Sequence, residues 1–583
     1  MDEGTYLMKG LLFVQGVYTP FEPYGPLTNK TPLSYYIPGL AQALFGAGLR
    51  TGRYFAIFLG LLMLVGLWLA ARRLGGRWAA AGAVVLTAAN AANIVYYSVA
   101  ISQGLVACMV AWSLALCLGR GRRFWELALA AVLAGLVPLA RQNMLPFTGL
   151  LWLFLVWEYG RKRGLGAAAL GALVFAGLNA LWWPAIRDVI WRPLLPGSLG
   201  NLFGPSTVSL GESVGMASQN YNLLSKVFVF WEGLRINFAA LFGPLAAWIF
   251  WPARRGWRSP SDFRAAVLLS AALVVLTAEH YYASAGLDYC LFCYGGYLSF
   301  FSPIGLLLVI AWYPSRAGQP GWLRGALASL LVIVGSTGLG FAAYQVIHKP
   351  LMALPVPRIK DLHILPGKAE LWRTLSNKFG WSYDFLQQFI PTLAGLGLGI
   401  LLVLAAVLLA RAVRRKGSVL RAGQLALAAF LGLGVVLTPT AILSGRTVSD
   451  DCGDIIAAHE AAGAALAAEV PPGARVYWEN DLSPLPLLYL PGRSIFPPQL
   501  NHWYNQRQGG DPDQLYRSGY WNEELAGQWV QEADFLLIAD RYADEWVEKI
   551  GSENPGEFDE LAPTPWVAPC VDRSMIHIFR RTQ

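Results

Sequence analysis

Long apolar runs alternate with short polar segments from residue 51 to residue 443. A helix needs about 20 apolar residues to cross the roughly 30 Å hydrocarbon core of a bilayer. We predict spans at 51–71, 78–96, 99–119, 124–141, 145–159, 165–185, 229–251, 264–282, 290–312, 322–345, 389–410 and 422–443. The pattern therefore predicts an all-α polytopic membrane bundle of about 12 transmembrane helices.

Basic residues mark the loops that follow every second predicted span. The loops beginning near 72, 120, 161, 254, 316 and 411 are rich in Arg and Lys, whereas 97–98, 142–144 and 283–289 contain neither. By the positive-inside rule the basic loops are cytoplasmic. Residues 1–50, the loops at 186–228 and 346–388, and everything after 444 are then expected outside, with the bundle at 51–444.

The first fifty residues are expected to form an outer catalytic loop with an interfacial helix at 33–48. That stretch is apolar and aromatic but too short to span a bilayer comfortably. No span precedes this outer segment, so we expect that an N-terminal helix is absent from the sequence. The loop at 346–388 is predicted to contain one short helix near 368–377.

From residue 445 to 583 the composition becomes that of a soluble domain. Residues 451–470 read as an Ala-rich helix, and 474–479, 533–540 and 575–579 read as strands from their β-branched and aromatic content. We predict a small C-terminal α/β domain on the extracytoplasmic side.

The overall composition supports a membrane protein, since 55% of the 583 residues are hydrophobic and only 14% are charged. The net charge of +9 does not indicate nucleic-acid binding, because the basic residues are spread over the predicted cytoplasmic loops. No phosphate-binding loop or dinucleotide fingerprint stands between a strand and a helix. We therefore expect a lipid bilayer as partner and no nucleic acid.

The ionisable residues beside the spans gather at the predicted outer ends. Arg141 closes one span, Glu232 and Arg235 lie near the start of another, and Glu279, His280 and Asp288 flank an outer loop. The middles of the spans are almost free of charge. Transporters usually bind substrates near the midplane, so this distribution disfavours a transporter.

Ionisable residues at the outer ends of the spans suit the transfer of a sugar from a lipid phosphate to an acceptor outside the membrane. The leaving group is a stable phosphate anion, so cations such as Lys30 or Arg141 would stabilise the charge that it acquires. One carboxylate then suffices as the general base for the acceptor hydroxyl. Backside attack with a single base would invert the anomeric carbon, unlike hydrolysis with paired carboxylates.

Four motifs resemble the GT-C glycosyltransferases of the polyprenyl- or dolichyl-phosphate-mannose-protein mannosyltransferase-like group, including ArnT-like enzymes. They are Asp2-Glu3-Gly4-x-Tyr6, Gly16-Val-Tyr18-Thr-Pro20, Asn29-Lys30-Thr31-Pro32-Leu33-Ser34-Tyr35-Tyr36 and Arg141-Gln142-Asn143. The resemblance covers the first 150 residues by motif and the bundle by topology. The group normally has a transmembrane helix before the acidic pair and often two prolines after the lysine, where this chain has Thr31-Pro32.

The resemblance implies that Asp2 and its neighbour Glu3 are the catalytic carboxylates and that Lys30 contacts the donor phosphate. We place Arg141 at the same phosphate. Candidate substrate-binding residues are Tyr6, Tyr36, Glu279, His280 and Asp288. We expect no required cofactor and assign no metal ligand, although carboxylates near a phosphate are groups that a divalent cation can bind.

We therefore expect a membrane glycosyltransferase that moves a sugar from a polyprenyl-phosphate donor to a hydroxyl of a lipid, glycan or protein acceptor. The alternatives are a polytopic transporter or lipid flippase, and a non-catalytic glycan-binding membrane protein. The Ala-, Gly-, Leu- and Arg-rich composition favours a bacterial plasma membrane, with the active site and the C-terminal domain facing outside.

Overall fold

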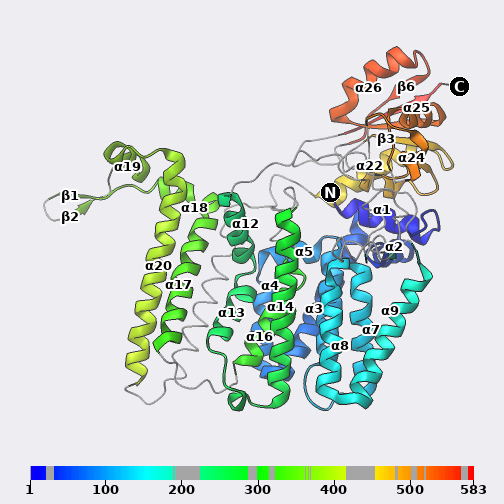
Figure 1. Ribbon diagram of the computed structural model, residues 1–583. Coiled ribbons are helices and arrows are strands. Elements are labelled where there is room, and N and C mark those ends of the chain that lie inside the picture. The colour runs from blue at the N-terminus through cyan, green and yellow to red at the C-terminus, as the bar shows by residue number, and fades with distance from the viewer. Residues whose placement is uncertain are drawn as a thin grey trace.

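The chain forms a bundle of helices with a small mixed sheet at one end (Figure 1). The computed structural model describes residues 2–20, 32–184, 186–187, 191, 223–286, 298–313, 322–360, 363–365, 367, 369–414, 454–479, 484–500, 508–517, 520–565 and 575–582. The predicted span at 422–443 and the predicted boundary at 444 lie outside these residues. The predicted domain limits therefore stay predictions.

The first half of the bundle follows two helices that lie across the end nearest the C-terminal sheet (Figure 1). In chain order the helices are α1 (Asp2–Val14), α2 (Pro32–Phe45), α3 (Leu49–Gly75), α4 (Arg77–Ala88), α5 (Ala91–Ser98), α6 (Ser102–Cys117), α7 (Phe124–Ala140), η1 (Gln142–Met144), α8 (Leu145–Gly160), η2 (Arg161–Leu165) and α9 (Gly166–Leu181). Helix α2 confirms the helix predicted at 33–48, whereas α1 was not predicted.

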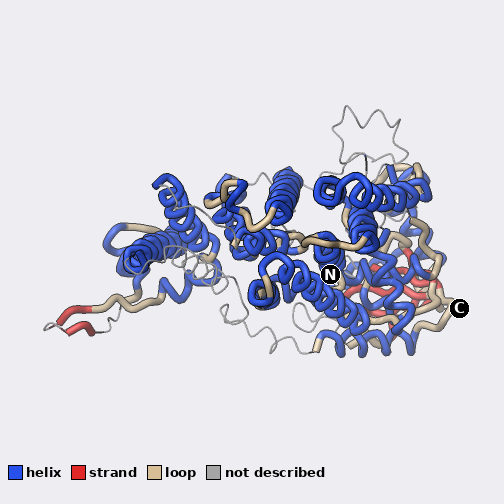
Figure 2. The backbone as a smooth tube through the Cα atoms, turned by 90° about the horizontal axis from the view of Figure 1, so that it is seen from below, coloured by secondary structure: helices blue, strands red, loops and turns tan. Residues whose placement is uncertain are grey.

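The second half continues with further helices and one small hairpin. The elements are α12 (Leu223–Ile236), α13 (Phe238–Ile249), η5 (Arg254–Gly256), α14 (Pro260–Gly286), α16 (Pro303–Trp312), α17 (Trp322–Ala342), α18 (Tyr344–Met352), β1 (Arg358–Lys360), β2 (His363–Leu365), α19 (Leu371–Phe379) and α20 (Tyr383–Arg414). Helix α19 corresponds to the short helix predicted near 368–377. The β1–β2 hairpin projects on the side away from the C-terminal sheet (Figure 2).

Five helical segments of the described chain are long and apolar enough to cross a membrane: Leu49–Gly75, Gln142–Leu181, Pro260–His280, Trp322–Ala342 and Tyr383–Leu409. The segment Gln142–Leu181 folds back on itself, because Gly160 has a positive φ of 75° and Trp152 of α8 packs against Phe175 of α9. The structure therefore supports a multi-pass helical protein, and the number of about 12 spans stays a prediction.

Two predicted spans are interrupted helices in the structure, which corrects the expectation of continuous spans there. The run 78–96 is divided between α4 and α5 at Asn90, and the run 229–251 is divided between α12 and α13 at Asn237. The Asn90 side chain donates to the Ile236 carbonyl at 2.7 Å, so the two interruptions contact each other. Asparagine side chains compete for backbone hydrogen bonds, which explains breaks at these positions.

The basic loops that the structure describes lie together at the end opposite the C-terminal sheet (Figure 1). Arg73 at the end of α3 is 3.9 Å from Glu126 at the start of α7, and Glu126 also pairs with Arg122 at 3.0 Å. Arg264 of α14 pairs with Glu158 of α8 at 3.0 Å. The grouping agrees with one basic face of the bundle.

The C-terminal sheet has the strand order β4-β3-β5-β7-β6. The strands are β3 (Arg475–Glu479), β4 (Ser494–Phe496), β5 (Phe535–Ala539), β6 (Phe558–Leu561) and β7 (Ile576–Arg581), among the helices α22 (Ile455–Glu469), η7 (Leu485–Tyr489), α24 (Pro512–Arg517), α25 (Glu523–Glu532) and α26 (Asp540–Glu553). Strand β3 is parallel to β4 and β5, whereas β7 is antiparallel to β5 and β6. The predicted helix and three predicted strands are confirmed, and the short β4 and β6 were missed.

Alternating residues of the sheet face two different cores, as the period of a strand requires. Tyr477 and Leu536 pack with α25 and α26, whereas Val476, Trp478 and Leu537 pack with α22 and η7. The second core also contains Leu7, Met8 and Leu11 of α1 and Tyr35 of α2. One face of the C-terminal sheet therefore shares its core with the N-terminal helices.

Candidate active site

The turn between α5 and α6 holds the start of α1 at the end of the bundle nearest the C-terminal sheet (Figure 1). Glu3 is only 3% exposed, and its Oε1 accepts a hydrogen bond from the Ala100 amide at 2.9 Å. One helical turn later the Tyr6 hydroxyl lies 3.3 Å from Ser102 Oγ. Residues i and i+3 of a helix lie on the same side. The same face of α1 therefore contacts both Ala100 and Ser102.

Arg141 also contacts this part of the chain, through Ser102. Helix α7 ends at Ala140, and Arg141 takes an extended conformation there, with φ −150° and ψ 114°. Its Nη1 donates to Ser102 Oγ at 2.9 Å, and its guanidinium lies 4.8 Å from the centre of the Phe300 ring. Ser102 therefore bridges Tyr6 and Arg141, two candidate residues that are far apart in sequence.

His280 joins the same neighbourhood through Phe300. Its ring centre is 5.2 Å from that of Phe300 and 5.0 Å from that of Phe301. Asn143 Nδ2 lies 2.6 Å from His280 Nε2, and Leu276 O lies 2.6 Å from Nδ1. The imidazole is 2% exposed and is held by both nitrogens, so its contacts in this structure fix its orientation.

The two candidate tyrosines of the N-terminal helices lie in an aromatic group on α1 and α2. The Tyr6 ring stacks on Tyr35 at 5.2 Å, and Tyr36 packs against Phe13 with ring centres 5.4 Å apart. Burial raises the pKa of Tyr36. Close backbone contact permits this packing, because a Cβ on Gly39 would lie 2.0 Å from the Gly10 carbonyl oxygen.

The remaining candidate residues are only partly described. Asp2 is the first residue of α1, but its side chain lies outside the described atoms, as do Lys30 and Asp288 entirely. Glu279 precedes His280 on α14 and is half-buried, and its Oε2 has no hydrogen-bond partner among the described residues. The structure thus brings together Glu3, Tyr6, Arg141 and His280, with Tyr36 in the adjoining aromatic group.

Arg53 is a member of this neighbourhood that the sequence interpretation missed. It donates from Nε and Nη2 to the two oxygens of Glu3, at 3.2 and 2.9 Å. The useful signal was a cation near the predicted outer end of a span, where the positive-inside rule disfavours one. Such a residue calls for an anionic partner, and Glu3 is the nearby carboxylate that supplies it.

A small, mostly apolar pocket adjoins this turn between α2, α3 and α6. Its lining includes Ile37, Phe55, Leu59 and Leu105, and it reaches Ala100 and Ser102 at its polar end. An apolar lining that ends at hydrogen-bonding groups is typical of sites for amphiphilic ligands. The pocket therefore lies beside the bridge formed by Ser102.

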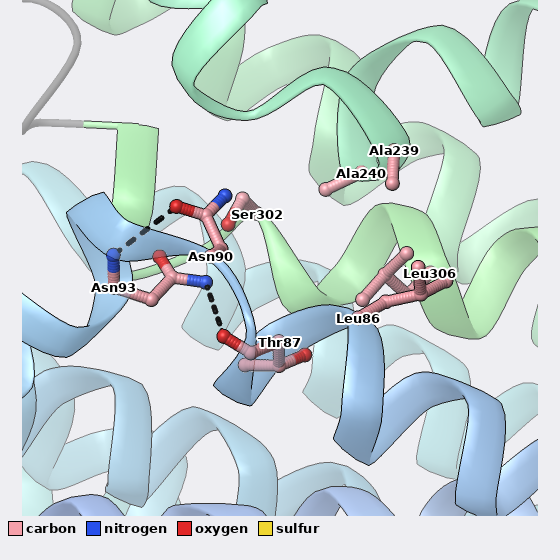
Figure 3. A pocket seen from close by; sticks show the side chains of 8 residues that line it. All are labelled: Leu86, Thr87, Asn90, Asn93, Ala239, Ala240, Ser302 and Leu306. Carbon is pink, nitrogen blue, oxygen red and sulfur yellow. Dashed lines mark hydrogen bonds between the residues drawn. The ribbon is translucent and has the colours of Figure 1, made fainter. Parts of the chain in front are cut away.

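A second small pocket lies where the interrupted helices meet, and Figure 3 shows its lining. Asn90, Asn93, Thr87 and Ser302 contribute polar groups, and Ala239, Ala240, Leu86 and Leu306 complete it. Asn93 donates to the Thr87 carbonyl at 3.2 Å, while its Oδ1 has no hydrogen-bond partner in the described chain. A buried carbonyl of this kind is commonly satisfied by water. No lining residue is ionisable.

The described residues contain no group of three or more His, Cys, Asp or Glu side chains that could hold a metal ion. Glu3 already uses both oxygens with Arg53 and Ala100.

Comparison with protein families gives one match, to dolichyl-phosphate-mannose-protein mannosyltransferase, over residues 29–183. The match includes Lys30 and Arg141, and Asp2 and Glu3 precede it. It confirms the resemblance expected from the sequence, and with it the glycosyltransferase class. A search of curated proteins finds no match.

Three solved structures resemble the whole chain. ArnT from Cupriavidus metallidurans bound to undecaprenyl phosphate has a TM-score of 0.48 and 15% identity, covering 99% of this chain and 93% of that one. The apo form of the same protein has a TM-score of 0.46 and 14% identity, with the same coverage. The Archaeoglobus fulgidus oligosaccharyltransferase has a TM-score of 0.34 and 13% identity, covering 96% of this chain and 68% of that one.

Proposed function

We propose that this chain, a glycosyltransferase related to dolichyl-phosphate-mannose-protein mannosyltransferases, moves a sugar from a polyprenyl-phosphate donor to a hydroxyl outside the cell. The acceptor hydroxyl belongs to a lipid, a glycan or a protein. The observation that carries the proposal is the bridge from Tyr6 through Ser102 to Arg141, with distances of 3.3 and 2.9 Å. It joins the first turn of α1 to a cation at the end of α7.

The reaction needs one proton acceptor and cations for the leaving group. Asp2 takes the proton of the acceptor hydroxyl while that oxygen attacks the anomeric carbon from the side opposite the phosphate. The bond between the anomeric carbon and the phosphate oxygen breaks, and its electron pair leaves with the polyprenyl phosphate. Lys30 and Arg141 stabilise the developing negative charge, and the product has inverted configuration.

Glu3 has a different role in this proposal from its neighbour Asp2. Its two oxygens are occupied by Arg53 and by the Ala100 amide, at 2.9 to 3.2 Å. Both oxygens already have hydrogen-bond partners within the protein, so a substrate hydroxyl would have to displace one of them. We therefore assign Glu3 to positioning α1 and leave the base to Asp2.

In this proposal the donor headgroup binds at Arg141, near Tyr6 and His280. Guanidinium groups bind phosphate oxygens with two parallel N–H donors, and Ser102 and Phe300 orient the guanidinium of Arg141. The pocket between α2, α3 and α6 offers an apolar surface beside it. Asp288, Glu279 and Tyr36 stay candidates for contacts with the sugar or the acceptor.

We place the protein in a bacterial plasma membrane, with α1 and the C-terminal domain outside. The basic loops at the opposite end of the bundle support this orientation. The reaction as written requires no cofactor, and a divalent cation at the phosphate is tested by adding a chelator.

The direct test supplies purified protein with labelled polyprenyl-phosphate sugars and a membrane extract as acceptor. Wild type is expected to form product, and Asp2→Asn is expected to lower its rate by about 10²–10⁴-fold, the usual contribution of a general base. The matched control is Asp559→Asn, an exposed carboxylate on β6, which is expected to keep full activity. Product formation by Asp2→Asn at the wild-type rate would refute the assignment of the base.

A transporter or flippase is the second candidate, and the pocket of Figure 3 is the observation in its favour. It lies at interrupted helices, where transporters bind their substrates. Its lining is uncharged, and it offers only the groups of Thr87, Asn90, Asn93 and Ser302. Asn93→Leu would abolish transport under this alternative and leave sugar transfer intact under ours.

A further inference from the structure

The C-terminal domain touches the outer end of α3 next to the Glu3–Arg53 pair. Glu460 of α22 accepts hydrogen bonds from Arg50 Nε and Nη2, both at 2.8 Å. Arg50 and Arg53 lie three residues apart on α3, so they are neighbours on the helix surface. One arginine therefore binds α22 of the C-terminal domain, and the other binds α1.

His459 precedes Glu460 and lies near Arg53 and Glu3. Its pKa is lowered to about 4 by burial and by the Arg53 cation, against the opposite effect of Glu3. The imidazole is therefore neutral at pH 7 and adds no third charge. Its Nδ1 is buried and makes no hydrogen bond to any residue that the structure describes.

Tyr489 makes a second attachment at the start of α3. Its hydroxyl accepts a hydrogen bond from the Leu49 amide at 3.2 Å. Its ring packs on Gly463 of α22, where an added Cβ would lie 2.3 Å from the ring carbon Cγ. Leu49 would otherwise have an unused amide at the helix start, since the first amides of a helix have no partner within it.

An apolar core joins these polar contacts to α1 itself. Leu7 and Leu11 of α1 share one buried cluster with Leu466 of α22 and with Leu487 and Leu488 of η7. All five are at most 6% exposed. In this arrangement, α1 is enclosed between the bundle on one side and the C-terminal domain on the other.

We propose that the C-terminal domain is a clamp that positions α1, and therefore Asp2, over the donor site, with Glu460 and Tyr489 as positioning residues. The inference rests on the proposed function of Asp2 at the start of α1. The bundle holds the first two turns of α1 through Ala100 and Ser102, and the clamp packs against the adjoining face at Leu7 and Leu11. Small displacements of a catalytic group reduce its rate strongly, by as much as about 10²-fold for 1 Å.

Charge reversal tests the clamp better than deletion, because the Arg50–Glu460 pair is half-exposed and exposed pairs are weak when considered alone. Glu460→Arg puts a cation against Arg50 and near Arg53. We expect its kcat to fall about tenfold or more, with an unchanged KM for the donor. The double variant Arg50→Glu with Glu460→Arg is expected to recover most of kcat, because it restores an ion pair.

Two further variants are measured beside these. Glu469→Arg reverses an exposed charge at the far end of the same helix and is expected to behave as wild type. Tyr489→Phe removes only the hydroxyl that binds the Leu49 amide and keeps the ring in the core. It is expected to lower kcat by a smaller factor than Glu460→Arg without unfolding the domain.

Hydrogen exchange of the α1 amides, followed by mass spectrometry, supplies a readout that does not depend on activity. Exchange between Glu3 and Leu11 is expected to quicken in Glu460→Arg and to return toward wild type in the double variant. Unchanged exchange, unchanged kcat or failure of the double variant to recover would each overturn the clamp. If wild type transfers no sugar but the exchange pattern holds, the proposed function fails while the attachment of α1 stands.

Discussion

At the residue scale, Glu3 is a buried carboxylate whose partners are other residues of the protein. It is 3% exposed and neutralises Arg53, which is itself partly buried. Glu3→Gln keeps the shape but leaves Arg53 without its anion. We expect this change to lower the free energy of unfolding by about 1–3 kcal/mol, the cost of a poorly satisfied buried polar group. Thermal unfolding in detergent measures it.

The two roles for Glu3 make different predictions in the same experiment. If Glu3 positions α1, Glu3→Gln lowers the unfolding temperature together with activity. If Glu3 is a proton acceptor, activity falls by about 10²–10⁴-fold, much further than in a positioning role with the same loss of stability. Glu532→Gln, an exposed residue at the end of α25, is the matched control and is expected to change neither quantity.

At the element scale, α17 and α20 form a pair that depends on small residues at their contact. A Cβ on Gly395 would lie 2.3 Å from the Ser336 carbonyl oxygen and 3.1 Å from the Gly340 Cα. Membrane helices associate closely where small residues let their backbones approach. We expect Gly395→Ala to cost about 1–3 kcal/mol, the usual penalty of overpacking.

The neighbouring Gly397 supplies the control on the same helix. A Cβ at this position meets no atom within 4 Å, so Gly397→Ala is expected to be neutral or slightly stabilising, since alanine favours helix. The unfolding temperatures of the two purified variants, compared with that of wild type, test both expectations. Equal temperatures would show that α17 and α20 tolerate separation at this point.

At the scale of the whole molecule, the two ends of the bundle are chemically different. One end carries Arg73, Arg122 and Arg264 with their partners, and the other carries α1, α2 and the C-terminal sheet (Figure 1). From the positive-inside rule we predict that Lys162 lies in the cytoplasm and the C-terminal domain outside.

Labelling with a membrane-impermeant maleimide tests this orientation in intact cells. In a chain whose own cysteines are replaced, Glu532→Cys is expected to react and Lys162→Cys to react only after the cells are opened. Both positions are exposed in the structure, so access to the thiol depends on the side of the membrane. The reverse pattern would put α1 in the cytoplasm and exclude a donor site on the outer face.

The sequence was sufficient for features that depend on local pattern. Apolar runs predicted membrane helices, and period and residue type predicted α2, α19, α22 and three strands of the C-terminal sheet. The motifs at 29–36 and 141–143 lie within the region that matches the mannosyltransferase family. These features can be predicted from the sequence because each depends on a few consecutive residues. What decides them is how favourably those side chains move from water to an apolar phase.

Other features depended on contacts between distant segments, and only the tertiary structure decided them. The 100–102 turn joins Glu3 and Tyr6 to Arg141, and α22 reaches Arg50 across 410 residues of sequence. The hydrogen bond from Asn90 to Ile236 brings together two helix interruptions that lie far apart in the sequence. No local pattern encodes which polar groups meet, because their partners are chosen when apolar faces pack and enclose them.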